Sequence, residues 1–166
     1  MTHSMGLVSA RFGKYFMKLG KDEVSRCIRI FDPFLMIDGI SEFIERDCAV
    51  GYKSVAENDW YMKSHLPEDL VMPATLQVEG MLQTMVTLIY KSFDHQGSSA
   101  FINKFDVSLV APVKPGHIIQ YHAQLTSFRR GICKGIIVGK VEEYDVCRAS
   151  VTYASPSLYS NTVFTK

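Results

Sequence analysis

Residues 65–79 place a histidine, a proline-led apolar run and a glutamate within one short segment of the chain. His65 lies in a Pro-rich stretch, Pro73 opens the apolar run, and Glu79 follows one to two helical turns later. An imidazole titrates near neutral pH and suits a general base, and a helix N-terminus offers free amides to a developing negative charge. Proton chemistry next to a carbonyl needs a base, such an N-terminus and a carboxyl group.

The apolar run predicts one long helix over residues 74–92, because its hydrophobic residues lie on most sides and indicate burial. A single polar stripe interrupts it, formed by Thr75, Glu79, Gln83 and Thr87 at intervals of four residues. A carboxyl group on a buried helix is costly unless it is paired, protonated or functional. Gln83, one turn after Glu79, is placed to hold that carboxyl group by hydrogen bonding.

The rest of the chain reads mainly as strands. We expect a short helix over 22–30 with Asp22 near its N-cap, a hairpin of strands 34–44 and 48–56 with a bulge at Gly39, and a loop over 59–73. Four further strands follow, with turns at 112–116, Arg130-Gly131 and Tyr144-Asp145; they span 100–110, 117–128, 132–143 and 146–154. An apolar helix among so many strands predicts an α+β fold in which a curved antiparallel sheet wraps the helix.

Length and composition predict one ordinary globular domain. The chain has 166 residues, of which 47% are hydrophobic and 21% charged. We expect an extension at 1–20, a single domain at 21–156 and a tail at 157–166. The net charge of +1 gives no reason to expect a nucleic-acid partner, and no Cys/His cluster has zinc spacing. With no signal peptide and no apolar stretch long enough for a membrane, we predict a cytoplasmic protein with reduced thiols.

The motif resembles that of the β-hydroxyacyl-acyl carrier protein dehydratases of type II fatty-acid synthesis, approximately G-H-F-P-G-H-P-V-M-P-G-x-x-x-x-E-x-M-A-Q. Here Ser64-His65-Leu66-Pro67 is followed by Val71-Met72-Pro73-Ala74 and then Glu79-Gly80-Met81-Leu82-Gln83, with the same fourteen-residue separation of His and Glu. Residues 32–38 resemble the family's P-F-L-x-I-D strand, and residues 112–116 its P-V-x-P-G turn. Ser64 and Ala74 replace glycines, and residues 68–70 replace Gly-His-Pro. The resemblance therefore does not specify which acyl group the substrate carries.

This resemblance, which covers roughly residues 28–154, implies a hot-dog fold and dehydration of 3-hydroxyacyl thioesters on acyl carrier protein to trans-2-enoyl thioesters. It implies His65 as base and Glu79 as proton donor, although His65 can also handle both protons. The Ala74 amide would stabilise the oxyanion, and the Val71 carbonyl would orient the imidazole. It also implies no metal or redox cofactor, and a homodimer, or a higher assembly of dimers, in which His65 of one subunit faces Glu79 of the other.

Other interpretations remain for the same residues. Singly, a loop histidine, a helical glutamate and a helical glutamine are more often structural than functional. Together, at this spacing, they favour a functional role for His65 and Glu79. For Gln83, a functional and a structural role are equally favoured. The rival functions are a hot-dog thioesterase, a hydratase acting on coenzyme A thioesters, and a non-catalytic acyl-binding partner subunit. The intact His65 and Glu79 pair speaks against the last of these.

Overall fold

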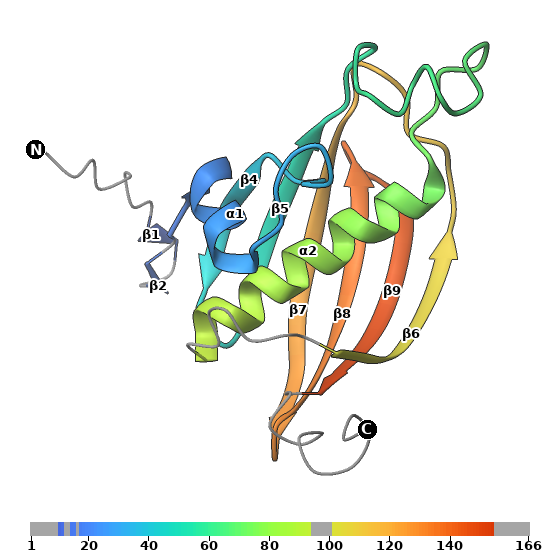
Figure 1. Ribbon diagram of the computed structural model, residues 1–166. Helices are drawn as coiled ribbons and strands as arrows, with labels where there is room; N and C mark the ends of the chain where they lie inside the picture. Colours follow the sequence, from blue (N-terminus) through green and yellow to red (C-terminus); the bar gives the residue numbers. More distant parts are fainter. Residues whose placement is uncertain (1–9, 12–13, 16, 94–100, 155–166) are drawn as a thin grey trace, which may run out of the picture.

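One helix, α2 (Ala74–Phe93), crosses the face of a long antiparallel sheet in the computed structural model (Figure 1). The structure describes residues 10–11, 14–15, 17–93 and 101–154. Within this part of the chain, seven strands form the sheet in the order β3 (Leu19–Gly20), β4 (Gly39–Ile44), β5 (Cys48–Ser54), β7 (Ile118–Arg129), β8 (Ile132–Val141), β9 (Tyr144–Ala154) and β6 (Phe101–Leu109). Helix α1 (Lys21–Ile28) lies beside α2, and β1 (Ala10–Arg11) pairs separately with β2 (Lys14–Tyr15).

The sheet follows from the alternation of side chains along its central strands. On β7, Ile119, Tyr121 and Ala123 are buried against α2, whereas the residues between them, Gln120 and His122, are exposed on the outer face. β8 alternates in the same way. An antiparallel sheet with one face on a helix and one in solvent requires this period of two, and the α+β hot-dog architecture predicted from the sequence is confirmed.

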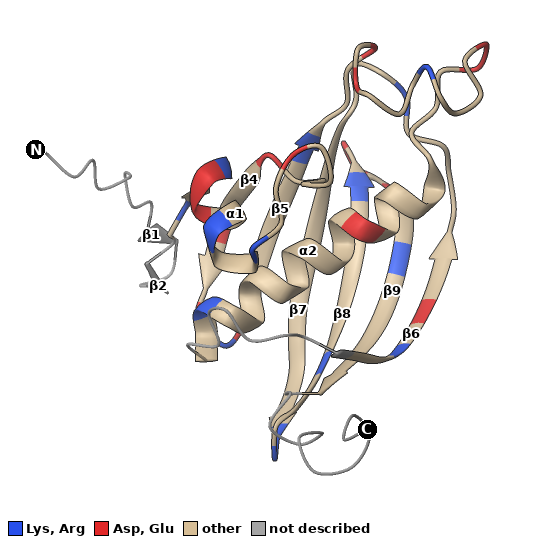
Figure 2. Ribbon diagram, viewed as in Figure 1, with Lys and Arg blue, Asp and Glu red and all other residues tan. Residues whose placement is uncertain are grey.

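Helix α2 is buried along most of its length, as its apolar sides predicted. Met81, Met85 and Leu88 are each no more than 1% exposed. Within the polar stripe, Gln83 and Thr87 are buried, Glu79 is half-buried and Thr75 is exposed. The helix carries only two charged residues, Glu79 and Lys91, and Figure 2 shows it largely uncharged against the sheet.

Gly80 allows the helix to approach the sheet closely. A Cβ at this position would lie 2.5 Å from Cζ and the hydroxyl oxygen of Tyr121 on β7. The Tyr121 ring is fully buried, so it has no free space into which to move. The glycine therefore sets the distance between α2 and the middle of the sheet, one residue after Glu79.

The first predicted hairpin forms, but its first strand is shorter than expected. β4 begins at Gly39, so residues 34–38 are not a strand, and the irregularity in its pairing falls between Ile40 and Glu42 instead of at Gly39. Helix α1 starts at Lys21 with Gly20 as its N-cap, so Asp22 lies in its first turn. Glu23 supplies the capping contact, because its carboxylate accepts a hydrogen bond from the Gly20 amide at 2.9 Å.

Of the later turns, one forms as predicted and one is shifted. Arg130 and Gly131, with φ of 51° and 75°, form the predicted two-residue turn between β7 and β8. The turn between β8 and β9 is made by Glu142 and Glu143, and Tyr144 already belongs to β9. Near the N-terminus, β3 joins the sheet at residues 19–20. The predicted tail at 157–166 lies outside the described residues. No helix in the described ranges is long and apolar enough to cross a membrane.

We predict that Gly80→Ala lowers the free energy of unfolding by about 2 kcal/mol. The added methyl group overlaps the buried Tyr121 ring, and this overpacking outweighs the gain in helix propensity. Urea denaturation monitored by circular dichroism measures the change. Gly20→Ala is the control for added volume, because its methyl group would meet only the flexible Glu23 carboxylate at 3.8 Å. Alanine at this N-cap costs about 1 kcal/mol at most, which is less than the expected effect at Gly80. A Gly80→Ala protein as stable as this control would show that the helix is not held at that distance.

Candidate active site

The loop that carries His65 joins β5 to α2 and projects beyond the end of the sheet, near the N-terminal end of α2 (Figure 1). The His65 amide donates a hydrogen bond to the Tyr61 carbonyl at 2.9 Å. After the histidine the chain turns tightly, because the Asp69 and Leu70 amides both donate to the Leu66 carbonyl. Leu66 and Leu70 each have φ of 46°, a left-handed conformation that is uncommon for bulky residues. The loop is thus folded by its own backbone hydrogen bonds.

The His65 side chain is half-buried, and its Nδ1 is buried without a hydrogen-bond partner among the described residues. The hydrogen bond to the Val71 carbonyl that the resemblance implied is therefore not made by Nδ1 here. Buried polar atoms without partners are rare in folded proteins, and each one requires an explanation. Within the described residues, no hydrogen bond at Nδ1 therefore fixes the orientation of the ring.

The far end of the loop is fixed by a neighbouring segment and leads directly into α2. The Met72 amide donates to the Val113 carbonyl at 2.8 Å, and Pro73 is buried. The Pro73 carbonyl accepts hydrogen bonds from the Leu76 and Gln77 amides, which closes the first turn. Ala74 is exposed at this helix N-terminus, where helical geometry leaves its amide without an intrahelical acceptor.

Glu79 is held by Gln83, as the spacing of four residues predicted. The Gln83 Nε2 donates a hydrogen bond to the Glu79 Oε1 at 2.8 Å. A carboxylate that accepts a hydrogen bond from a fixed amide has a restricted orientation. The predicted hydrogen bond is confirmed, whereas the functional roles of these residues remain predictions.

Gln83 itself is buried at 1% exposure and uses its remaining hydrogen-bonding atoms on the segment before β4. Its Nε2 also donates to the Phe34 carbonyl at 2.8 Å, and its Oε1 accepts from the Met36 amide at 2.7 Å. Both amide hydrogens are therefore occupied inside the protein. This geometry is that of a residue that positions Glu79, and a contact of Gln83 with substrate remains a prediction.

The segment before β4, which bonds to Gln83, also contacts the loop that carries His65. The Trp60 Nε1 donates to the Pro33 carbonyl at 2.9 Å, one residue before the carbonyl that Gln83 holds. No local pattern predicts this contact of Trp60, because its partner lies 27 residues away along the chain. His65 and Glu79 are nevertheless not joined by a hydrogen bond or an ion pair within the described part of this single chain.

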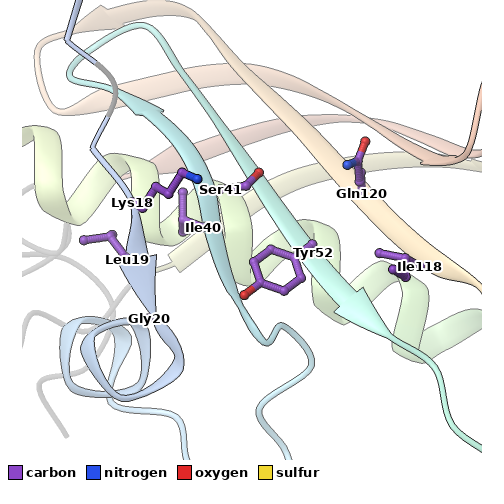
Figure 3. Close-up of a pocket in the computed structure, with 8 residues that line it drawn as sticks. All are labelled: Lys18, Leu19, Gly20, Ile40, Ser41, Tyr52, Ile118 and Gln120. Atoms are coloured by element: carbon purple, nitrogen blue, oxygen red, sulfur yellow. The ribbon is translucent and has the colours of Figure 1, made fainter. Parts of the chain in front are cut away.

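Other features of the surface lie apart from these residues. A groove of about 450 Å³ lies on the sheet face opposite α2 (Figure 3), and neither His65 nor Glu79 lines it; its lining residues are Lys18, Leu19, Gly20, Ile40, Ser41, Tyr52, Ile118 and Gln120. No three His, Cys, Asp or Glu side chains of the described residues gather as a metal site would require. The candidate site therefore consists of the His65 loop, the first two turns of α2 and Gln83.

Comparison with known proteins assigns most of this chain to one family. The model of the FabA-like domain matches residues 31–150, which contain the whole His65 loop and α2. The chain is 36% identical over 123 residues to the 3-hydroxyacyl-(acyl-carrier-protein) dehydratase FabZ of Bacillus cytotoxicus, and the match covers 74% of this chain and 85% of that protein.

Solved structures share the fold at low sequence identity. The dehydratase heterocomplex ApeI:P from Xenorhabdus doucetiae matches with a TM-score of 0.67 and 12% identity, over 83% of this chain and 97% of that one. A hypothetical thioesterase with coenzyme A from Streptococcus pneumoniae matches with a TM-score of 0.56 and 14% identity, over 70% of this chain and 83% of that one. These likenesses establish the fold alone.

We predict that Gln83→Met lowers the free energy of unfolding by about 3 kcal/mol. The thioether fills similar volume but leaves the Met36 amide and the Phe34 carbonyl without their partner, at about 1–3 kcal/mol for each buried group. Urea denaturation again provides the measurement. Gln124→Met is the matched control, since this exposed amide bonds only to Asp47 and its own neighbour, and should change stability by less than about 1 kcal/mol. Equal stability of the two variants would contradict the positioning role.

Proposed function

The chain belongs to the FabA-like domain family, and from this membership we propose that it removes water from 3-hydroxyacyl thioesters to give trans-2-enoyl thioesters. We propose acyl carrier protein as the carrier of the substrate and the cytoplasm as the location. The observation that carries the proposal is the 36% identity to a dehydratase named for this reaction, in a match that covers 85% of that dehydratase. The hydrogen-bonded Glu79 at the start of α2 supports it from the structure.

We propose that His65 is the base and Glu79 the acid. The His65 imidazole accepts the proton from the carbon next to the thioester carbonyl, and the electron pair moves onto the carbonyl oxygen. The Ala74 amide, at the positive end of α2, stabilises that oxygen. When the electron pair returns, the bond to the 3-hydroxyl breaks and Glu79 donates the proton that makes it water. His65 then gives its proton back to Glu79 through solvent.

Gln83 supports this assignment, because its hydrogen bond fixes the Glu79 Oε1. The other carboxyl oxygen is the one that we assign to the proton transfer. Val71 remains our proposal for the carbonyl that orients the imidazole when substrate is bound. The half-buried Val78 and Leu82 flank Glu79 on α2 and offer an apolar surface for the acyl chain. A hydroxyl next to such a surface would be protonated by Glu79 with little competition from water.

We further propose a homodimer in which each site takes His65 from one subunit and Glu79 from the other. Strand β6 is the last strand of the described sheet, and it exposes apolar residues: Ile102, Val107 and Leu109 are each more than 40% exposed, as is Val110 just beyond it. An exposed apolar edge strand is a template for pairing with a second chain. A second copy on this edge would extend the sheet and cover the open side of α2.

We predict that His65→Ala lowers dehydration turnover by about 10²–10⁴-fold, the typical value of a positioned general base. The assay uses 3-hydroxyacyl thioesters of both acyl carrier protein and coenzyme A, and it follows enoyl formation and free thiol release separately. His122→Ala is the control, since His122 is exposed on the outer face of β7. Thiol release without enoyl formation by the wild-type protein would instead identify a thioesterase. Full activity of a folded His65→Ala protein would remove His65 from the mechanism.

We predict that Val107→Lys shifts the protein toward monomer and lowers activity in parallel, because it places a charge on the apolar edge strand. Sedimentation velocity across a range of concentrations measures the shift. Ile136→Lys makes an equivalent change at 47% exposure on β8, away from the edge, and should leave the assembly intact. A wild-type protein that sediments only as a monomer at micromolar concentration would contradict the shared site.

A further inference from the structure

The loop before His65 is held by a partly buried network of charged and polar side chains that the mechanism has not used. Asp59 lies at its centre: its Oδ2 accepts hydrogen bonds from the Tyr61 hydroxyl at 2.7 Å and from the Ala56 amide at 3.0 Å. Its Oδ1 lies 3.5 Å from the Lys53 Nζ on β5. The side chains of Asp59 and Lys53 are only 18% and 12% exposed, so these contacts are poorly screened by solvent.

This network is anchored in the sheet. The Lys53 Nζ also lies 3.3 Å from the Asp38 Oδ1, and the other Asp38 oxygen accepts a hydrogen bond from the Ser54 amide at 2.8 Å. Lys53 therefore lies between two carboxylates, one beside β4 and one in the loop. Because removing either partner of such a group leaves a poorly solvated charge, the arrangement strongly resists displacement of the loop.

At its other end the network reaches the backbone of His65. Tyr61 is 2% exposed, and its carbonyl accepts hydrogen bonds from both the Ser64 and the His65 amides, at 3.1 and 2.9 Å. Burial and the neighbouring Asp59 raise the pKa of Tyr61 well above its usual range, so the hydroxyl remains a donor throughout the physiological range. A fixed Tyr61 side chain thus fixes the carbonyl on which the histidine backbone rests.

We propose that Lys53, Asp59 and Tyr61 are positioning residues for the reaction, acting through the His65 backbone. The inference rests on the proposed role of His65 as base. Since His65 Nδ1 has no partner among the described residues, the orientation of the ring depends on this backbone support. A displacement of about 1 Å at a catalytic group can cost about 100-fold in rate, so a modest loosening of this loop is measurable in turnover.

The test compares Tyr61→Phe with Tyr153→Phe in purified full-length protein. Both remove a phenol hydroxyl from a tyrosine that is 2% exposed, but Tyr153 lies near the end of β9, at the opposite end of the sheet from the His65 loop (Figure 1). We expect Tyr61→Phe to lower kcat about tenfold, the loss of one hydrogen bond to a charged acceptor, with KM unchanged. Tyr153→Phe should leave kcat unchanged. A kcat that is equal in the two variants would overturn the proposal.

A double-mutant cycle with His65→Ala separates positioning from a general structural role. If Tyr61 acts through His65, removing its hydroxyl should cause no further loss of turnover in the His65→Ala protein. The same proportional loss in both backgrounds would contradict the proposal. Lys53 gives a second variant: Lys53→Met should reproduce the loss in kcat, and Lys53→Arg, which keeps the charge between Asp38 and Asp59, should restore it. Failure of Lys53→Arg to exceed Lys53→Met would also count against the network.

Hydrogen exchange followed by NMR provides a measurement that does not depend on activity. In Tyr61→Phe the His65 amide should exchange about tenfold faster, whereas amides of β7 and β8 keep their rates. Uniformly faster exchange, or no change at His65, would overturn the proposal. If His65→Ala retained full activity, the proposed function of His65 would fail, and the exchange rates would still report whether the network holds that residue.

Discussion

The buried amide of Gln83 is the interaction on which the arrangement of the site depends. A primary amide inside a protein must place both its hydrogens and its oxygen, and Gln83 places them on Glu79, Phe34 and Met36. These contacts fix the rotation of α2 relative to the segment that precedes β4. Because the same amide also bonds to Glu79, the main-chain contacts that hold Gln83 fix the nitrogen from which Glu79 accepts its hydrogen bond. The helix and its one acidic residue are therefore positioned together.

His65 is held by different means. Its loop is fixed through Asp59 and Tyr61 on one side and through Met72 on the other, and its ring makes no hydrogen bond at Nδ1 within the described residues. One candidate residue is thus bound by its side chain and the other by its backbone. The two are not in hydrogen-bonding contact in the described part of one chain, and the completion of the site by a second copy is our proposal. Rigid supports on both sides suit a reaction that moves protons at fixed positions.

Much of this could be predicted from the sequence, because local patterns encode it. The apolar sides of α2 and the alternation along β7 set helix and strands, and a spacing of four residues placed Gln83 beside Glu79. The error at residues 34–38 has a tertiary cause. These residues have strand-like composition, but the Phe34 carbonyl and the Met36 amide bond to Gln83, 49 and 47 residues away. The contacts of Trp60 and Lys53 escaped prediction for the same reason, since neither residue type nor local spacing specifies such distant partners.

Turnover by mixed dimers is the most direct measurement of whether His65 and Glu79 are two halves of one site. His65→Ala and Glu79→Gln proteins, each nearly inactive alone, are unfolded together, refolded and assayed for enoyl thioester formation. In a shared site, a mixed dimer has one site that lacks both residues and one that contains both. Activity should therefore return, to as much as half that of the wild type in each mixed dimer. If refolding together yields mixed dimers without any recovery, His65 and Glu79 do not act across the interface and the site proposed here is wrong.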